Sequence, residues 1–172
     1  KLLLSSKAEV GIAALTPNPA LQAAARRAQD QAVGVLLQAR AEINGKSTKG
    51  ETALLAALQA PAERIAKTLG VLLKFKADVN LGDEDGKTPL LVALQTNIPD
   101  TALKCLIQAD ADPNIADERG WAAMHHVASG AFDSSAAVHA ARVLMDCKAN
   151  PGLAEQGLSR TPLHMAATAS DA

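Results

Sequence analysis

The sequence from Lys76 to Leu90 reads KADVNLGDEDGKTPL and contains two short signatures that recur along the chain. The first is Ala-Asp-x-Asn. The second is Gly-x-Thr-Pro-Leu, whose threonine lies eight residues after that asparagine. Variants of the first signature, separated by 33, 36, 34 and 38 residues, start at Ala8, Ala41, Ala77, Ala111 and Ala149. A period in this range indicates a repeat architecture, in which each copy is one supersecondary unit stacked on its neighbours.

The second signature recurs in phase with the first. Eight residues after Asn44 comes Thr52, and eight after Asn114 comes Ala122, while the last copy reads TPLHMAA from Thr161 onward. This motif resembles that of the ankyrin-repeat family, whose unit is a β-turn and two helices with a T-P-L-H-x-A core and a period near 33. The resemblance covers essentially the whole chain. It implies an all-α solenoid of stacked helix-turn-helix units with finger-like turns.

The phase of the two signatures divides the chain into complete repeats with a partial repeat at each end. We expect residues 1–10 to be the end of a truncated repeat and residues 152–172 to begin a further one. The complete repeats are expected at 11–43, 44–79, 80–113 and 114–151. Neither end has the polar outer face of a capping repeat, so we expect this chain to be a segment of a longer protein.

Helix ends and buried faces follow from the same pattern. Thr52 and Thr88 are predicted N-caps, because a hydroxyl can accept a hydrogen bond from an orphan backbone N–H. Ala122 lacks that hydroxyl, typically a loss of about 1 kcal/mol, so repeat four is expected to be the least stable complete repeat. Its interhelical loop, 129–135, is expected to absorb the 38-residue period. In repeat one, the side chains expected to face the core are Ala32, Val33, Val35, Leu36 and Leu37.

Composition excludes several function classes. The 172 residues are 48% hydrophobic and 20% charged, with a formal net charge of −1, which gives no bulk electrostatic case for nucleic-acid or membrane binding. No apolar run approaches the ~20 residues that a membrane helix requires, and residues 1–4 are too short for a targeting segment. The two cysteines have neither a metal-binding spacing nor a disulfide pattern. We therefore expect an intracellular protein, cytoplasmic or nuclear.

The histidines do not suggest a catalytic or metal site. His125 and His164 occupy the histidine position of T-P-L-H, where the resemblance implies a hydrogen bond to backbone between neighbouring turns. His126 is adjacent to His125 and so points elsewhere on a helix, and His139 belongs to another helix. No nucleophile motif, phosphate-binding loop or paired carboxylates occur outside turns. We expect no catalytic residue, no metal, no cofactor and no small-molecule substrate.

The residue just before the first signature is commonly glycine in the family, because the backbone there tends toward the left-handed region. This chain has Lys7, Arg40, Lys76, Asp110 and Lys148 instead. A side chain in that conformation costs about 1 kcal/mol, part of which a cation near a helix C-terminus recovers. The four basic residues would form a broken column along one edge. That column is either solvated helix-end charge or a docking stripe for an acidic partner.

The segments between the two signatures differ most in charge. Residues 45–49 are basic, 83–85 acidic and 117–119 mixed. The resemblance implies that the tips of these fingers and the exposed faces of the first helices form a concave surface that binds a partner protein. Trp121, the only tryptophan, is either a partner contact or packs on the neighbouring finger. The candidate contacts are Trp121, Arg119, Asp83, Asp85, Lys46 and Lys49.

The resemblance implies non-catalytic protein recognition. Two alternatives remain: an architectural spacer inside a large assembly, and a regulatory ankyrin segment of a larger protein. A recognition module should capture a partner by itself, whereas an interior spacer should self-associate through its open ends.

Overall fold

The computed structural model describes residues 19–96, 100–129 and 134–169, so the predictions for residues 1–10 and for Lys7 lie outside it. All regular secondary structure in these ranges is helical, as expected. The helices are α2 (Pro19–Arg26), α3 (Asp30–Gln38), α4 (Ala53–Ala57), α5 (Ala62–Lys74), α6 (Pro89–Gln95), α7 (Asp100–Gln108), α8 (Ala123–Ala128), α9 (Ser134–Asp146) and α10 (Pro162–Ala169).

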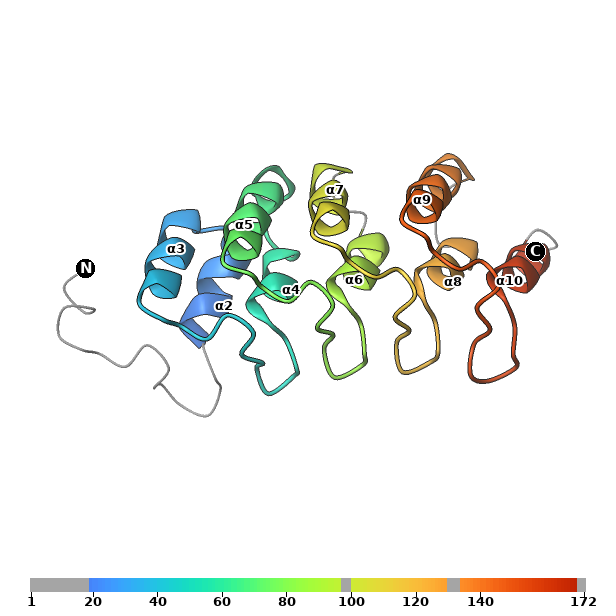
Figure 1. Cartoon of the computed structure of the whole chain (residues 1–172), viewed down its shortest axis with the longest axis horizontal. Coiled ribbons are helices and arrows are strands. Elements are labelled where there is room, and N and C mark those ends of the chain that lie inside the picture. Colours follow the sequence, from blue (N-terminus) through green and yellow to red (C-terminus); the bar gives the residue numbers. More distant parts are fainter. Residues whose placement is uncertain (1–18, 97–99, 130–133, 170–172) are drawn as a thin grey trace.

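The helices stack in two rows along an elongated molecule (Figure 1). Helices α2, α4, α6, α8 and α10 form one row, here called the inner row, and α3, α5, α7 and α9 form the outer row. Long loops project beyond the inner row, on the side away from the outer row. We call these loops finger two (45–51), finger three (81–87), finger four (115–121) and finger five (153–160). The fold is therefore the solenoid that the repeated signatures predict.

The inner-row helices α4 and α6 begin next to the threonines that were predicted as their N-caps. The Thr52 hydroxyl accepts a hydrogen bond from the Leu55 N–H at 3.2 Å, and Thr88 accepts from the Leu91 N–H at 3.4 Å. Both threonines are buried, so their hydroxyls replace a water contact that these N–H groups cannot make. Both predicted caps are confirmed. At Ala122 no side-chain cap is present, as its methyl group dictates.

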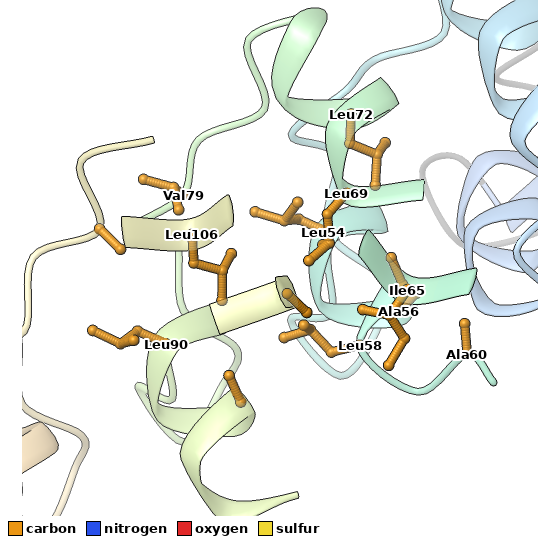
Figure 2. Packing of buried hydrophobic residues seen from close by; sticks show 14 of the residues in the cluster. Leu54, Ala56, Leu58, Ala60, Ile65, Leu69, Leu72, Val79, Leu90 and Leu106 are labelled. Carbon is orange, nitrogen blue, oxygen red and sulfur yellow. The ribbon is translucent and has the colours of Figure 1, made fainter. Parts of the chain in front are cut away.

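The core runs between the rows and is built from leucine and alanine. Leu54, Leu69 and Leu72 come from one helix pair, and Leu90 and Leu106 come from the next (Figure 2). Each of these five side chains is at most 1% exposed. Burying a leucine is worth roughly 1.5–3 kcal/mol, so this cluster supplies much of the stacking energy. Many of the remaining core residues are alanines, whose small side chains let neighbouring helices approach closely.

One prediction about packing was wrong. Val35 is 37% exposed, although it was expected in the core. Val33 and Leu37 lie one helical turn apart and are buried, so Val35, midway between them, faces the other way. In the repeat with the 38-residue period, α9 has 13 residues where α7 has nine. The prediction that loop 129–135 absorbs this period concerns residues 130–133, which lie outside the described ranges.

The Ala-Asp-x-Asn signature links each unit to the next. The Asp78 carboxylate accepts a hydrogen bond from the Asn80 N–H at 2.9 Å, which fixes the turn. The Asn80 side-chain oxygen then accepts from the Asp112 N–H in the following unit at 2.8 Å. Asn44 and Asn114 make the same inter-unit contact, at 2.9 and 2.7 Å. The asparagine recurs because its amide oxygen reaches a backbone donor that the next turn leaves unpaired.

The turn before this signature is left-handed. The φ angles of Arg40, Lys76, Asp110 and Lys148 lie between 62° and 65°, which confirms the prediction. The backbone reverses direction here to leave the outer helix, and the chain uses charged residues in place of glycine. All four side chains are exposed, so their charges remain in water.

Candidate protein-interaction surface

Fingers two, three and four are each shaped by one short polar side chain. In finger three, Oδ1 of Asp83 accepts hydrogen bonds from the N–H groups of Asp85 and Lys87, at 3.0 and 2.9 Å. Asp117 does the same in finger four, and Ser47 does so through its hydroxyl in finger two. Asp83, a predicted partner contact, therefore uses one of its two carboxylate oxygens to hold its own turn.

Adjacent fingers touch each other closely. Gly50 has a φ of 69°, and a Cβ atom placed on it would lie 2.5 Å from the backbone nitrogen of Glu84. The ammonium group of Lys46 donates to the Gly82 carbonyl at 2.7 Å, so this predicted contact spans fingers two and three. The Glu118 N–H in finger four donates to the Asp85 carbonyl at 3.0 Å. Backbone contacts of this kind hold the fingers as one continuous surface.

A cleft of about 310 Å³ opens where fingers two and three meet the inner row. Its rim is polar, whereas Leu55 of α4 and Val92 of α6 contribute apolar surface. Glu51 accepts hydrogen bonds there from Arg26 of α2 and, at 2.9 Å, from Gln59 in the turn after α4. The lining residues are Arg26, Lys49, Glu51, Leu55, Gln59, Asp83 and Val92. The structure thus brings the predicted contacts Lys49 and Asp83 together with helix residues that the finger pattern alone did not single out.

The remaining candidates lie further along the fingers. Asp85 is exposed in finger three, where its carboxylate pairs with Lys87 at 3.1 Å. The Arg119 side chain is exposed in finger four. Trp121, at the base of that finger, is half-buried and donates its indole N–H to the Glu155 carboxylate of finger five at 2.7 Å. Its ring also meets that of His126 edge-on, with 5.4 Å between ring centres. Trp121 therefore packs on the neighbouring finger.

Glu155 ties fingers four and five together. Its second oxygen accepts a hydrogen bond from Nε of Arg160 at 2.6 Å. The hydrogen bonds from Arg160 and Trp121 hold the pKa of the Glu155 carboxyl below its ordinary value. The carboxylate is buried and has both oxygens engaged, so it serves the contact between fingers.

A family model for ankyrin repeats (three copies) matches residues 21–101 and, overlapping them, residues 63–152. The chain belongs to the ankyrin-repeat family. Ankyrin repeats are generally protein–protein interaction modules, and the family is typically non-catalytic. The comparison with curated proteins finds no match. In the ranges that the structure describes, no helix is long and apolar enough to cross a membrane.

Both histidines of the ankyrin motif bond backbone, and His125 also makes the contact between neighbouring turns that the resemblance implied. His125 is fully buried, with Nδ1 accepting from the Ala122 N–H at 3.2 Å and Nε2 lying 3.3 Å from the Arg160 carbonyl of the next unit. At His164, Nδ1 accepts from the Thr161 N–H at 3.2 Å. One imidazole thus holds the start of its own helix and reaches the start of the next.

His126 is buried beside a carboxylate. Its Nε2 lies 3.2 Å from the Asp117 carboxylate, and its Nδ1 lies 3.4 Å from the Gln95 amide nitrogen of the preceding unit. Burial lowers the pKa of His126, although Asp117 opposes the shift. Across the described residues, no group of three or more His, Cys, Asp or Glu is placed to hold a metal ion.

Sequence reasoning missed the role of Gln22. Its amide nitrogen donates to the carbonyls of Glu51 at 2.6 Å and Gly45 at 3.2 Å. Glu51 immediately precedes the cap of the next inner helix, as Arg160 does, so Gln22 makes the bond that His125 makes elsewhere. The sequence did contain a signal for this role. Gln22 follows Leu21 just as histidine follows leucine in T-P-L-H, so Gln22 occupies the histidine position of the motif.

Within the described ranges, the column of residues before the first signature has mixed charge. Arg40, Lys76 and Lys148 are exposed, and Asp110 interrupts them. Beside Lys148, a second cleft of about 500 Å³ is lined by three carboxylates, those of Asp110, Asp112 and Asp146. A docking stripe along this edge stays a prediction.

Proposed function

We propose that this chain is a non-catalytic recognition module that binds a partner protein on the surface formed by the fingers and the inner row. This surface corresponds to the concave surface of the ankyrin family. The observation that carries the proposal is the cleft between fingers two and three, where apolar side chains lie under a charged rim. Interfaces combine these features, an apolar centre and a polar rim.

The predicted contacts fit this surface in different ways. Lys49 and Asp83 line the cleft, while Lys46, Asp85 and Arg119 extend the surface along the fingers. Trp121 has its N–H engaged by Glu155, so only the exposed part of its ring is available to a partner. Because the fingers are held by backbone contacts, binding would require little ordering of the scaffold.

The setting that we propose is the cytoplasm or nucleus. Cys105 and Cys147 are both free thiols and half-buried, which suits a reducing compartment. The balanced charge of the chain favours a protein partner over nucleic acid or a membrane. The sequence contains neither a cofactor motif nor a nucleophile motif, and we propose no substrate.

Affinity capture from cell extract, with this chain as bait, tests the proposal. The Lys49→Glu/Arg119→Glu double variant should lose a partner that the parent retains, because both side chains are exposed on the proposed surface. Lys104→Glu is the matched control, because Lys104 is exposed on outer helix α7. Circular dichroism must show that all three proteins are equally folded. Equal capture by all of them would reject this surface and leave the basic column as the next candidate.

One observation favours the architectural alternative. Leu158 and Leu163, at the α10 end, are 74% and 77% exposed, whereas Leu54 and Leu90 on earlier inner helices are 1% exposed. Such leucines could stack against a further subunit. Sedimentation equilibrium distinguishes the two functions. Self-association that Leu163→Glu abolishes, with no heterologous partner captured, would favour the spacer; the regulatory alternative depends on sequence beyond this chain.

A further inference from the structure

The acidic groups of the cleft between fingers two and three are largely used within the protein. Glu51 has one oxygen paired with Arg26 and the other bonded to Gln59. Asp83 has Oδ1 bonded to two backbone N–H groups of its own finger. Of the carboxylate oxygens that line the cleft, only Oδ2 of Asp83 has no hydrogen bond among the described residues. Free carboxylate oxygens are therefore scarce in this cleft.

The cationic groups of the cleft, in contrast, have hydrogen-bond donors that are not used among the described residues. Within the described ranges, the Lys49 ammonium has no hydrogen bond or ion pair, and the residue is exposed. Arg26 donates to Glu51 through Nη2 alone, and its side chain is 50% exposed. Its remaining N–H groups are available. Lys46 differs, since its ammonium is bonded to the Gly82 carbonyl. The cleft thus presents unpaired donors from two side chains, one on a finger and one on a helix.

Apolar surface lies beside these donors. Val92 on the next inner helix is half-buried and offers this surface, whereas Leu55, at 3% exposed, lies almost wholly beneath it. Both line the cleft together with Lys49 and Arg26. An apolar side chain placed there would lose water contact at little polar cost.

We propose that this cleft recognises an acidic segment of the partner protein, with an Asp or Glu carboxylate bound by Lys49 and Arg26 and a neighbouring apolar side chain against Leu55 and Val92. The inference rests on the proposed function and names the chemistry of its partner. A basic segment fits poorly, because it would meet the Lys49 ammonium and the Arg26 guanidinium, while only one carboxylate oxygen of the cleft is left without a hydrogen bond among the described residues. The free Oδ2 of Asp83 suits a backbone N–H of the bound segment.

The arrangement is formed before binding. Glu51 holds the Arg26 guanidinium, and the close contact of Gly50 with Glu84 fixes finger two, which carries Lys49. A carboxylate would therefore meet one donor already restrained by its own partner. Preorganisation of this kind gives affinity without an ordering cost in the protein.

The test selects binders to the full chain from a random peptide library and measures their affinity by fluorescence anisotropy. Selected peptides should carry Asp or Glu close to Leu, Val or Ile. Lys49→Glu should weaken their binding at least tenfold, about 1.4 kcal/mol, because it replaces attraction with repulsion. Lys104→Glu, the same charge change outside the cleft, should leave affinity unchanged. Asp→Asn or Glu→Gln in the peptide should reproduce the loss, and added salt should weaken parent binding.

The other outcomes separate this inference from the proposed function. Peptides that need the cleft but show no acidic preference would overturn the inference and leave the proposed function standing. Tighter binding of a phosphoserine version than of the Asp or Glu peptide would assign the cleft to a phosphopeptide and overturn the carboxylate assignment. If Lys49→Glu changes nothing for any selected peptide, the cleft is not a binding site, and both fail.

Discussion

Two junctions between inner-row helices, α4 with α6 and α8 with α10, are built from the same signatures. They differ in the side-chain contacts that join one unit to the next. Between α8 and α10, His125 reaches the Arg160 carbonyl, and Trp121 donates to Glu155. Between α4 and α6, Leu55 occupies the position of His125 and cannot donate a hydrogen bond. The charged finger residues around Leu55 instead border a cleft.

This difference indicates which side chains are available to a partner. Where a finger residue bonds the next unit, its polar groups serve the stacking of the array. Where it does not, as at Lys49, the polar group remains exposed and unpaired within the described structure. The most conspicuous candidate in the sequence, Trp121, thus has less to offer a partner than a lysine at a finger tip.

The largest expected effect comes from breaking the contact between fingers two and three. Gly50→Ala would place a Cβ 2.5 Å from the Glu84 nitrogen in a residue with a φ of 69°. We expect a loss of about 2 kcal/mol or more in urea unfolding, combining backbone strain and steric clash. Gly34→Ala is the control, because nothing lies within 4 Å of its Cβ position in helix α3. It should stabilise by about 0.5–1 kcal/mol, and equal behaviour of both variants would contradict the close approach.

The next largest effect on stability is expected when the α8–α10 junction is made to resemble the α4–α6 junction. His125→Leu places at α8 the residue type that α4 has, and leaves the Ala122 N–H and the Arg160 carbonyl without their partner. We expect a loss of about 2 kcal/mol, measured by urea unfolding, because these groups are shielded from water. His164→Leu is the matched control at the same motif position, where the side chain is exposed. A loss as large at His164 would show that the inter-unit bond is not the cause.

Trp121→Phe tests the hydrogen bond between Trp121 and Glu155 by itself. It keeps an aromatic ring beside His126 but removes the N–H that donates to Glu155. We expect a smaller decrease in melting temperature than for His125→Leu, since Arg160 still pairs with Glu155. Peptide binding at the cleft should not change. Loss of that binding would place Trp121 in the recognition site and require a larger interface than the cleft.

The smallest effect is a pH dependence at His126. Burial lowers its pKa in the folded state below the ordinary value of about 6.5, so the unfolded chain takes up the proton first as pH falls. Above about pH 6.5 the residue contributes no pH dependence, and below it stability decreases until the folded-state pKa is reached. The melting temperature of the parent should fall more between about pH 6.5 and pH 5 than that of His126→Gln. Identical pH curves would indicate that His126 titrates normally.

Local chemistry explains what could be predicted. Thr52 and Thr88 cap their helices because a hydroxyl next to a helix start has one nearby donor to satisfy. Arg40, Lys76 and Lys148 are left-handed because the chain must reverse after each outer helix, whatever residue stands there. The prediction that Val35 is buried was wrong, because apolar character in a short helix does not determine which side of the helix faces the core. Gln22 was missed because its donor role depends on a carbonyl 29 residues away.

By itself, the sequence determined the family, the order of helices and turns, and the spacing at which units stack, because each depends on residues close together in the chain. The tertiary structure decided which charged side chains are paired. Arg26 meets Glu51, Trp121 meets Glu155, and Lys49 meets no partner in the described structure. These pairings join residues in different units, and their geometry depends on how one unit packs on the next. The same packing places Leu55 and Val92 beside Lys49 and Arg26.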